Sequence, residues 1–190
     1  MKKFFFLVCM MLALGGCSTL VIRTDYDPQA DFSGLRTFAW ATQTQASTGN
    51  IKLDNPFLDK RIRDAVDGQL VAKGFLKDTA GNPDFLLRYL VTIQEKTDVR
   101  TIDTYYGGFT PIWCGGSVCY TTGFWVPQTV VYTYEQGTLV LDILDAKIQT
   151  LIWRGSAEAE VTESSTPEQR KAKVENAVKK LLAKFPPTKK

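Results

Sequence analysis

Apolar positions recur with period two in several stretches of the chain, which is the pattern of strands that bury one face. The pattern is clearest in residues 84–99, one side of which carries Phe85, Leu87, Tyr89, Val91 and Ile93. Further strands are expected in 20–26, 35–41, 129–134, 138–146 and 151–161. In the last of these, charged and small polar residues take the opposite side. We therefore expect antiparallel pairing with one face in water.

Two other stretches carry apolar residues at helical spacing behind a capping residue. The first helix is expected to begin after Asn55, a favourable N-cap that is followed by Pro56. Its apolar stripe consists of Leu58, Ile62, Ala65, Val66 and Leu70. The second is expected after Thr166, with Gln169 completing a capping box. Its stripe consists of Val174, Val178, Leu181 and Phe185.

The order of these elements predicts an α+β fold. We expect a mostly antiparallel sheet with two helices packed on one face. A Gly- and aromatic-rich segment, 105–127, interrupts the strand pattern and is expected to form a hairpin insertion stapled by a disulfide. No repeat or linker divides the rest, so residues 17–190 are expected to form a single domain.

The N-terminal residues have the layout of a secretory signal. Lys2 and Lys3 precede an apolar run, residues 4–14, and two glycines follow it. The run is too short for a transmembrane helix, which needs about 20 apolar residues. Residues 1–16 are therefore expected to be a signal peptide.

The end of this signal resembles the lipobox of bacterial lipoproteins. It reads Leu14-Gly15-Gly16-Cys17. The resemblance implies that Cys17 becomes the first mature residue and carries fatty acyl chains such as palmitate, which anchor the chain to a membrane. Ser18 after the cysteine is similar to lipoproteins of the outer membrane, with the domain facing the periplasm. The alternative is an ordinary signal peptide with an incidental cysteine.

Charge argues against a nucleic-acid partner. The chain has 23 basic and 20 acidic residues, and removal of residues 1–16 takes away Lys2 and Lys3. The remaining 21 basic residues nearly balance the acids, so there is no basic surplus to bind a phosphate backbone.

Two cysteines remain once Cys9 leaves with the signal and Cys17 is lipidated. They are Cys114 and Cys119, separated by four residues that include Gly115-Gly116. An exported compartment is oxidising, so we expect a disulfide across a tight turn. Free thiols are the alternative. Redox catalysis favours C-x-x-C spacing, and a zinc site needs more Cys or His than this chain has.

Four segments together resemble a family of bacterial lipoproteins defined by a domain of unknown function. They are "DYDPQADFSGLRTFAW" (25–40), "NPFLDKRIRDAVDGQLVAKGF" (55–75), "PDFLLRYLV" (83–91) and "GTLVLDILDAKIQTLIWRGSAEAEV" (137–161). The resemblance covers nearly the whole mature chain. It implies an α+β lipoprotein of the cell envelope and no catalytic residues.

Segment 105–127 is the most unusual part of the chain. Seven of its 23 residues are aromatic, five are glycine and none is charged. The irregular spacing of the aromatic residues does not fit a buried face. Candidates for an exposed binding surface are Tyr105, Tyr106, Phe109, Trp113, Phe124 and Trp125. The alternative is that they cover a sheet edge and fill a small core of their own.

Signs of enzymatic chemistry are few. The chain has no histidine, so neither a Ser-His-Asp triad nor a Cys-His pair can form within it. Asp142 and Asp145 could serve as paired carboxylates of an envelope glycan hydrolase, the alternative function. Asp25, Asp27 and Asp31 could suggest calcium, but Pro28 lies among them and turn-stabilising Asx contacts are expected instead.

These observations favour a non-enzymatic lipoprotein of the cell envelope. We expect a binding or structural module without metal or cofactor. Its expected partners are the membrane, through the N-terminal lipid, and an envelope protein or glycan.

Overall fold

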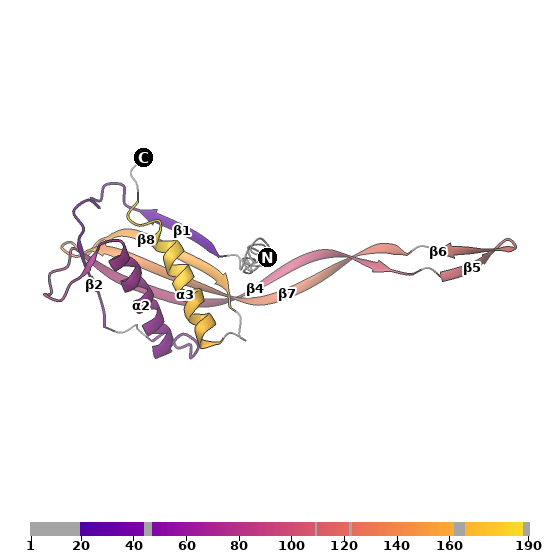
Figure 1. The fold of residues 1–190 in the computed structure, drawn as a ribbon, viewed down its shortest axis with the longest axis horizontal. Coiled ribbons are helices and arrows are strands. Elements are labelled where there is room, and N and C mark those ends of the chain that lie inside the picture. Colours follow the sequence, from indigo (N-terminus) through magenta and orange to yellow (C-terminus); the bar gives the residue numbers. More distant parts are fainter. Residues whose placement is uncertain (1–19, 44–46, 109, 122, 162–165, 188–190) are drawn as a thin grey trace, which may run out of the picture. The chain divides into compact units, whose positions relative to one another are not determined.

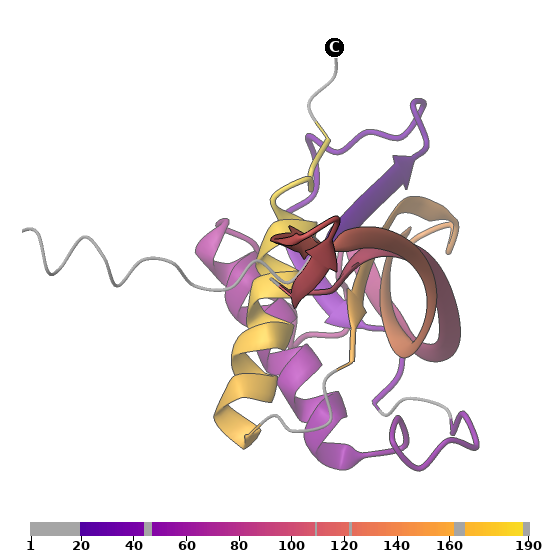
Figure 2. The ribbon, with the colours of Figure 1, turned by 90° about the vertical axis from the view of Figure 1, so that its right-hand side faces the viewer.

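The computed structural model describes residues 20–43, 47–108, 110–121, 123–161 and 166–187. The predicted signal peptide and Cys17 lie outside these residues. The described chain has an α+β fold with two helices and a mostly antiparallel, mixed sheet. Helices α2 (Pro56–Ala72) and α3 (Pro167–Leu182) pack against each other and lie on one face of that sheet (Figures 1 and 2).

The main sheet has six strands in the order β1-β8-β7-β4-β2-β3. Their bounds are Val21–Tyr26 (β1), Thr37–Trp40 (β2), Leu76–Lys77 (β3), Phe85–Tyr106 (β4), Phe124–Asp145 (β7) and Leu151–Glu160 (β8). A separate two-stranded sheet joins β5 (Thr110–Cys114) to β6 (Ser117–Thr121).

One edge of the main sheet is parallel. Strand β8 pairs antiparallel with β1 and β7, as the alternation predicted, but β2 pairs parallel with both β3 and β4. Helix α2 lies between β2 and β3 in the sequence, and such a crossover returns the chain in the same direction. The sheet is therefore mixed.

Strand lengths differ from the sequence expectation. Strand β4 extends to Tyr106, well beyond the predicted end at residue 99. The two strands expected at 129–134 and 138–146 are one continuous strand, β7. Gly137 lies within it, directly opposite Ala159 of β8. Cross-strand pairing thus carries one strand through Gly137, between the two predicted strands.

The hydrophobic core lies between the helices and the sheet. The period-two prediction for β4 is confirmed, because Phe85, Leu87, Tyr89 and Val91 are all buried. Both helical stripes are confirmed as well. Their buried members are Ile62, Ala65, Val66, Leu70, Val178, Leu181 and Phe185. An aromatic cluster fills the centre of the core, consisting of Phe38, Phe75, Phe85, Trp153 and Phe185.

Both helix starts follow the predicted capping chemistry. The side chain of Asn55 accepts a hydrogen bond from the backbone N–H of Phe57 at 2.9 Å. Thr166 and Gln169 form the reciprocal capping box, at 3.3 Å and 3.0 Å. These contacts satisfy backbone donors that a helix start leaves free. The residue at which each helix begins is thereby determined by its near neighbours in the sequence.

The chain divides into two compact units. The sheet–helix unit comprises the described residues up to Gln94 and from Gln136 onward, and it holds the hydrophobic core. The hairpin unit comprises residues 95–135, with the outer parts of β4 and β7 and the whole of β5 and β6.

Candidate functional site

The tip of the hairpin unit is a tight turn between β5 and β6. Cys114 is paired with Ser117, so Gly115 and Gly116 alone form the loop. Both glycines have positive φ angles, 54° and 100°. Two-residue hairpin loops require this backbone region, which glycine reaches without steric cost. The turn predicted from the Gly-Gly pair is therefore confirmed.

The two cysteines of this hairpin are close but not bonded. Their side chains approach to 2.6 Å, and both are free in the structure. A hydrogen bond with Cys119 is the main cause that raises the pKa of the Cys114 thiol. The structure thus brings the two residues together across the turn without showing the expected disulfide.

Glycines also permit a close approach within this unit. A Cβ atom on Gly107 would lie 2.6 Å from the Cα of Gly123, so the backbones meet where neither residue has a side chain. The backbone N–H of Gly123 donates to the hydroxyl of Tyr105 at 3.0 Å. The Tyr105 ring packs on Trp125 with centroids 5.1 Å apart. These contacts fix the positions of two of the predicted aromatic residues.

Most of the predicted aromatic residues are exposed to solvent. The exposed fraction is 80% for Trp113, 67% for Trp125 and 65% for Phe124. Tyr105 and Tyr106 are exposed to a lesser extent, and Phe109 lies outside the described residues. The structure therefore does not bury these side chains in a core of their own. Flat exposed rings can stack on sugar faces or on apolar protein surfaces.

Three residues that the sequence did not single out belong with this group, namely Thr104, Tyr120 and Gln128. Tyr120 on β6 is 63% exposed, and its place in the strand only follows from the register with β5. Gln128 hydrogen-bonds both the Thr104 hydroxyl, at 3.2 Å, and the Tyr106 hydroxyl. We name the exposed rings of Tyr105, Tyr106, Trp113, Tyr120, Phe124 and Trp125 the aromatic set.

The candidate carboxylates Asp142 and Asp145 are engaged in structural contacts. Asp142 accepts hydrogen bonds from Arg154 at 2.6 Å and 2.8 Å and from Arg88 at 3.0 Å. Burial raises the pKa of Asp142, but the hydrogen bonds and charges of Arg154 and Arg88 outweigh it and hold the pKa below its usual range. Asp145 accepts from the backbone N–H of Lys147 and Ile148, at 2.8 Å and 3.1 Å.

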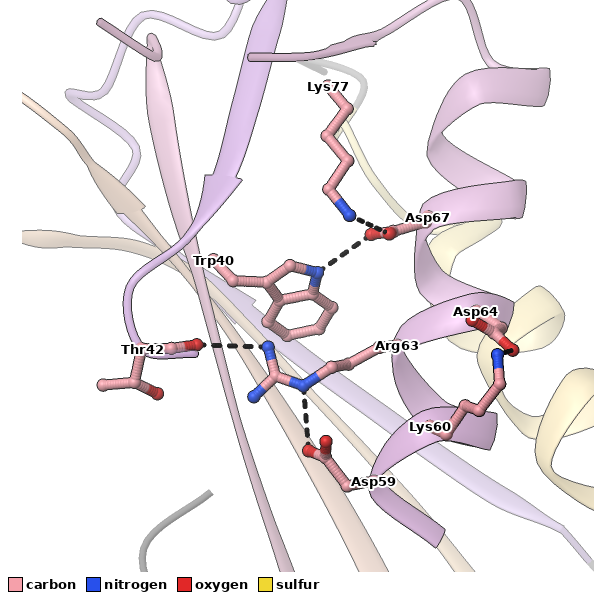
Figure 3. A network of polar contacts seen from close by, with 8 residues as sticks. All are labelled: Trp40, Thr42, Asp59, Lys60, Arg63, Asp64, Asp67 and Lys77. Atoms are coloured by element: carbon pink, nitrogen blue, oxygen red, sulfur yellow. Dashed lines mark hydrogen bonds and ion pairs between the residues drawn. The ribbon is translucent and has the colours of Figure 1, made fainter. Parts of the chain in front are cut away.

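A polar network fastens β2 to α2 in the sheet–helix unit (Figure 3). Asp67 accepts hydrogen bonds from the Trp40 indole N–H, at 2.9 Å, and from Lys77, at 2.6 Å. The Arg63 guanidinium lies 4.6 Å from the Trp40 ring centroid and donates to Asp59 at 2.8 Å. Since each group here binds another group of the fold, the network acts as a clamp between elements.

The acidic residues near the N-terminal end stabilise turns. Asp27 accepts from the backbone N–H of Gln29 at 2.8 Å, and Asp31 accepts from that of Ser33 at 2.9 Å. These i to i+2 contacts are the predicted Asx turns. Asp25 accepts from the N–H of Tyr26. Across the described ranges, no group of three or more Cys, Asp or Glu side chains is arranged to hold a metal ion.

Comparison with known proteins identifies the family. A model described as a domain of unknown function, DUF4136, matches residues 22–187. The chain belongs to the DUF4136 family. This match confirms the resemblance drawn from the sequence motifs, as far as a domain of unknown function is concerned. No curated protein matches the chain.

Solved structures that resemble this DUF4136 chain share little sequence with it. A PDZ domain protein from Parabacteroides distasonis is 17% identical with a TM-score of 0.53. The match covers 96% of this chain but only 40% of that protein, and it shows the fold alone. A PelC dodecamer from Paraburkholderia phytofirmans is 12% identical over 87% of this chain and 96% of its own, with a TM-score of 0.45.

A membrane-spanning helix needs about 20 predominantly apolar residues. Neither described helix has both the length and the apolar character to cross a membrane.

Proposed function

We propose that this protein is a non-enzymatic lipoprotein of the cell envelope whose aromatic set binds another envelope component. In this proposal Cys17 carries the lipid, the outer membrane holds the anchor and the domain faces the periplasm. The bound component is an envelope protein or glycan. The proposal includes a disulfide between Cys114 and Cys119, which would rigidify the hairpin that presents Trp113.

The observation that carries the binding role is the exposure of large aromatic side chains in a segment without charge. Trp113 is 80% exposed, and residues 105–127 contain no ionisable carboxylate, lysine or arginine. Exposed apolar rings in such density are unfavourable unless a partner covers them. The tyrosine hydroxyls add hydrogen-bonding capacity, which suits a partner with both apolar and polar groups.

Photo-crosslinking in cells tests the binding role. A photoreactive amino acid replaces Trp113, and adducts are identified by mass spectrometry. We expect one dominant protein or glycan adduct. The matched control places the same group at Phe57, an exposed aromatic residue of α2 that is 70% exposed. The same adduct from both positions, or adducts only within the chain, would contradict a specific role for the aromatic set.

Inhibition of the lipoprotein signal peptidase tests the anchor separately. Globomycin treatment is expected to accumulate a larger precursor, because cleavage before Cys17 requires that enzyme. Cys17→Ser should abolish acylation and cleavage, so that this variant stays at precursor size in the membrane fraction. A wild-type chain that matures normally under globomycin would show that the lipobox prediction is wrong.

A further inference from the structure

A pocket of about 480 Å³ that is open to solvent, which we call the cavity, lies in the sheet–helix unit, remote in sequence from the aromatic set. Ile62 of α2, Val91 of β4 and Leu139 of β7 contribute to its walls, and Val174 and Ala177 of α3 contribute as well. Most of the lining is therefore aliphatic. The volume falls within the range of roughly 300–1,000 Å³ that is usual for small-molecule sites.

Small residues of the sheet line this space, and the Val161 side chain packs over Gly137. Gly137 of β7 lies opposite Ala159 of β8, and Leu139 lies opposite Ala157. Gly137, Ala157 and Ala159 all line the cavity. The aromatic cluster instead places large rings such as Phe85 and Trp153 in the centre of the core. Large side chains thus cover the part of the sheet under the aromatic cluster, and small side chains line the part beside the first turns of α3.

The polar lining residues carry a positive balance. Lys52, Arg170 and Lys173 line the cavity, and Glu160 is the one acidic lining residue within the part of the chain that the structure describes. Each of these four residues also interacts within the protein. The net charge of the lining nevertheless favours an anion, because opposite charge raises the local concentration of an anionic group.

We propose that this cavity binds a free single-chain amphiphile with an anionic head group, of which a long-chain fatty acid is the simplest case. The aliphatic walls would cover the chain, and the basic residues would face the carboxylate. The charge balance favours such a ligand over the diacylglyceryl group proposed at Cys17, which carries no anion. This inference depends neither on lipidation nor on the aromatic set.

Photolabelling of the full chain tests this proposal. Isolated membranes that contain the protein are treated with a photoreactive palmitate probe, irradiated, and the labelled peptides are mapped. We expect adducts on peptides that contain Ala157 or Val174, and excess palmitate should suppress them. Ala159→Leu fills the cavity and should reduce the labelling several-fold. The control Ala183→Leu, just after α3, makes the same substitution at an exposed position and should label as the wild type does.

A second set of variants tests the anionic head group. Combined replacement of Lys52, Arg170 and Lys173 by Gln should lower palmitate labelling several-fold. Lys180→Gln, an exposed lysine of α3 outside the cavity lining, should leave it unchanged. Hexadecanol, which has the same chain without the charge, should compete less well than palmitate. Equal labelling of the triple variant, or equal competition, would overturn the head-group assignment.

The remaining outcomes are also decisive. No labelling of the cavity peptides in wild-type chain and in Cys17→Ser would overturn the proposal. Labelling of Cys17→Ser without labelling of the wild-type chain would mean that the lipid on Cys17 occupies the cavity of the wild type. That result would overturn the proposal of a free ligand. Circular dichroism confirms that each variant is folded. If Ala159→Leu is not folded, Ala177→Leu fills the same cavity from the helix side.

Discussion

At the scale of single residues, one carboxylate joins two parallel strands. Oδ2 of Asp84, the residue before β4, accepts hydrogen bonds from the backbone N–H groups of Arg36 and Thr37 at 2.9 Å each. It also accepts from the Thr37 hydroxyl at 3.0 Å. The bond from the Thr37 backbone is the largest cause that lowers the pKa of Asp84, followed by that from Arg36. The ionised form is thus the form that holds β2 beside β4.

This contact predicts a pH-dependent stability. Because the pKa of Asp84 is lower in the folded state, its stabilising contribution is present above its unfolded pKa of about 3.9 and is lost as the pH falls through the folded value. Asp84→Asn should therefore lower the free energy of unfolding at pH 7 by about 1 kcal/mol and flatten its loss below pH 4. Urea unfolding at several pH values measures both effects.

The control for this measurement is Asp64→Asn, on the exposed side of α2, where the carboxylate contacts only Lys60 among the bonds described. It should change the free energy of unfolding little at any pH. If the free energy of unfolding of Asp84→Asn falls below pH 4 as steeply as that of the wild type, the role of Asp84 is contradicted.

At the scale of elements, the β5–β6 hairpin is short and has few partners. Its five residue pairs join it into a sheet of two strands, and two-stranded hairpins are marginally stable in water. The proposed disulfide would close a loop of about six residues, which in the chain-entropy view contributes roughly 2 kcal/mol. Such a bond would stabilise the hairpin locally and leave the main core unaffected.

Thiol titration of mature protein, denatured without reductant, tests the disulfide. We expect no reactive thiol, because Cys114 and Cys119 are joined and the Cys17 sulfur is bonded to the diacylglyceryl group. Cys114→Ser should release one thiol, that of Cys119, and should speed amide exchange at Trp113 and Tyr120. Two reactive thiols in the wild-type protein would mean that the cysteines stay reduced, as they are in the structure.

At the scale of the whole molecule, the hydrophobic core belongs to the sheet–helix unit. None of the buried core side chains in the described ranges falls in residues 95–135. The hairpin unit instead carries exposed rings, which contribute little burial to the folding free energy. The stability of the fold and the proposed binding role are therefore carried by different parts of the chain.

Replacement of residues 105–127 by Asn-Gly tests this separation. We expect the melting temperature to change little, because few apolar groups are lost from the core. Phe85→Ala, at a fully buried position, should by contrast cost about 3–5 kcal/mol. Thermal unfolding followed by circular dichroism compares the variants. A large loss of stability in the shortened chain would show that the aromatic residues form a core after all.

Local features of this protein could be predicted from the sequence because their causes lie within a few residues. The caps at Asn55 and Thr166, the Asx turn at Asp27 and the Gly115-Gly116 turn all depend on near neighbours. Burial of alternate residues in β4 follows from the geometry of a strand, which turns successive side chains to opposite faces. The family resemblance indicated the type of domain but pointed to no functional site.

Other features depended on partners distant in the sequence. Only the paired strands decided that β2 is parallel to β4, that β7 continues through Gly137, and that Asp142 binds Arg88 and Arg154. The cavity is of the same kind, because it arises from small residues of different strands that meet under α3. Local patterns determine which elements form and which face they bury. The space and charge between elements are decided by tertiary packing, since they depend on residues that no local pattern relates.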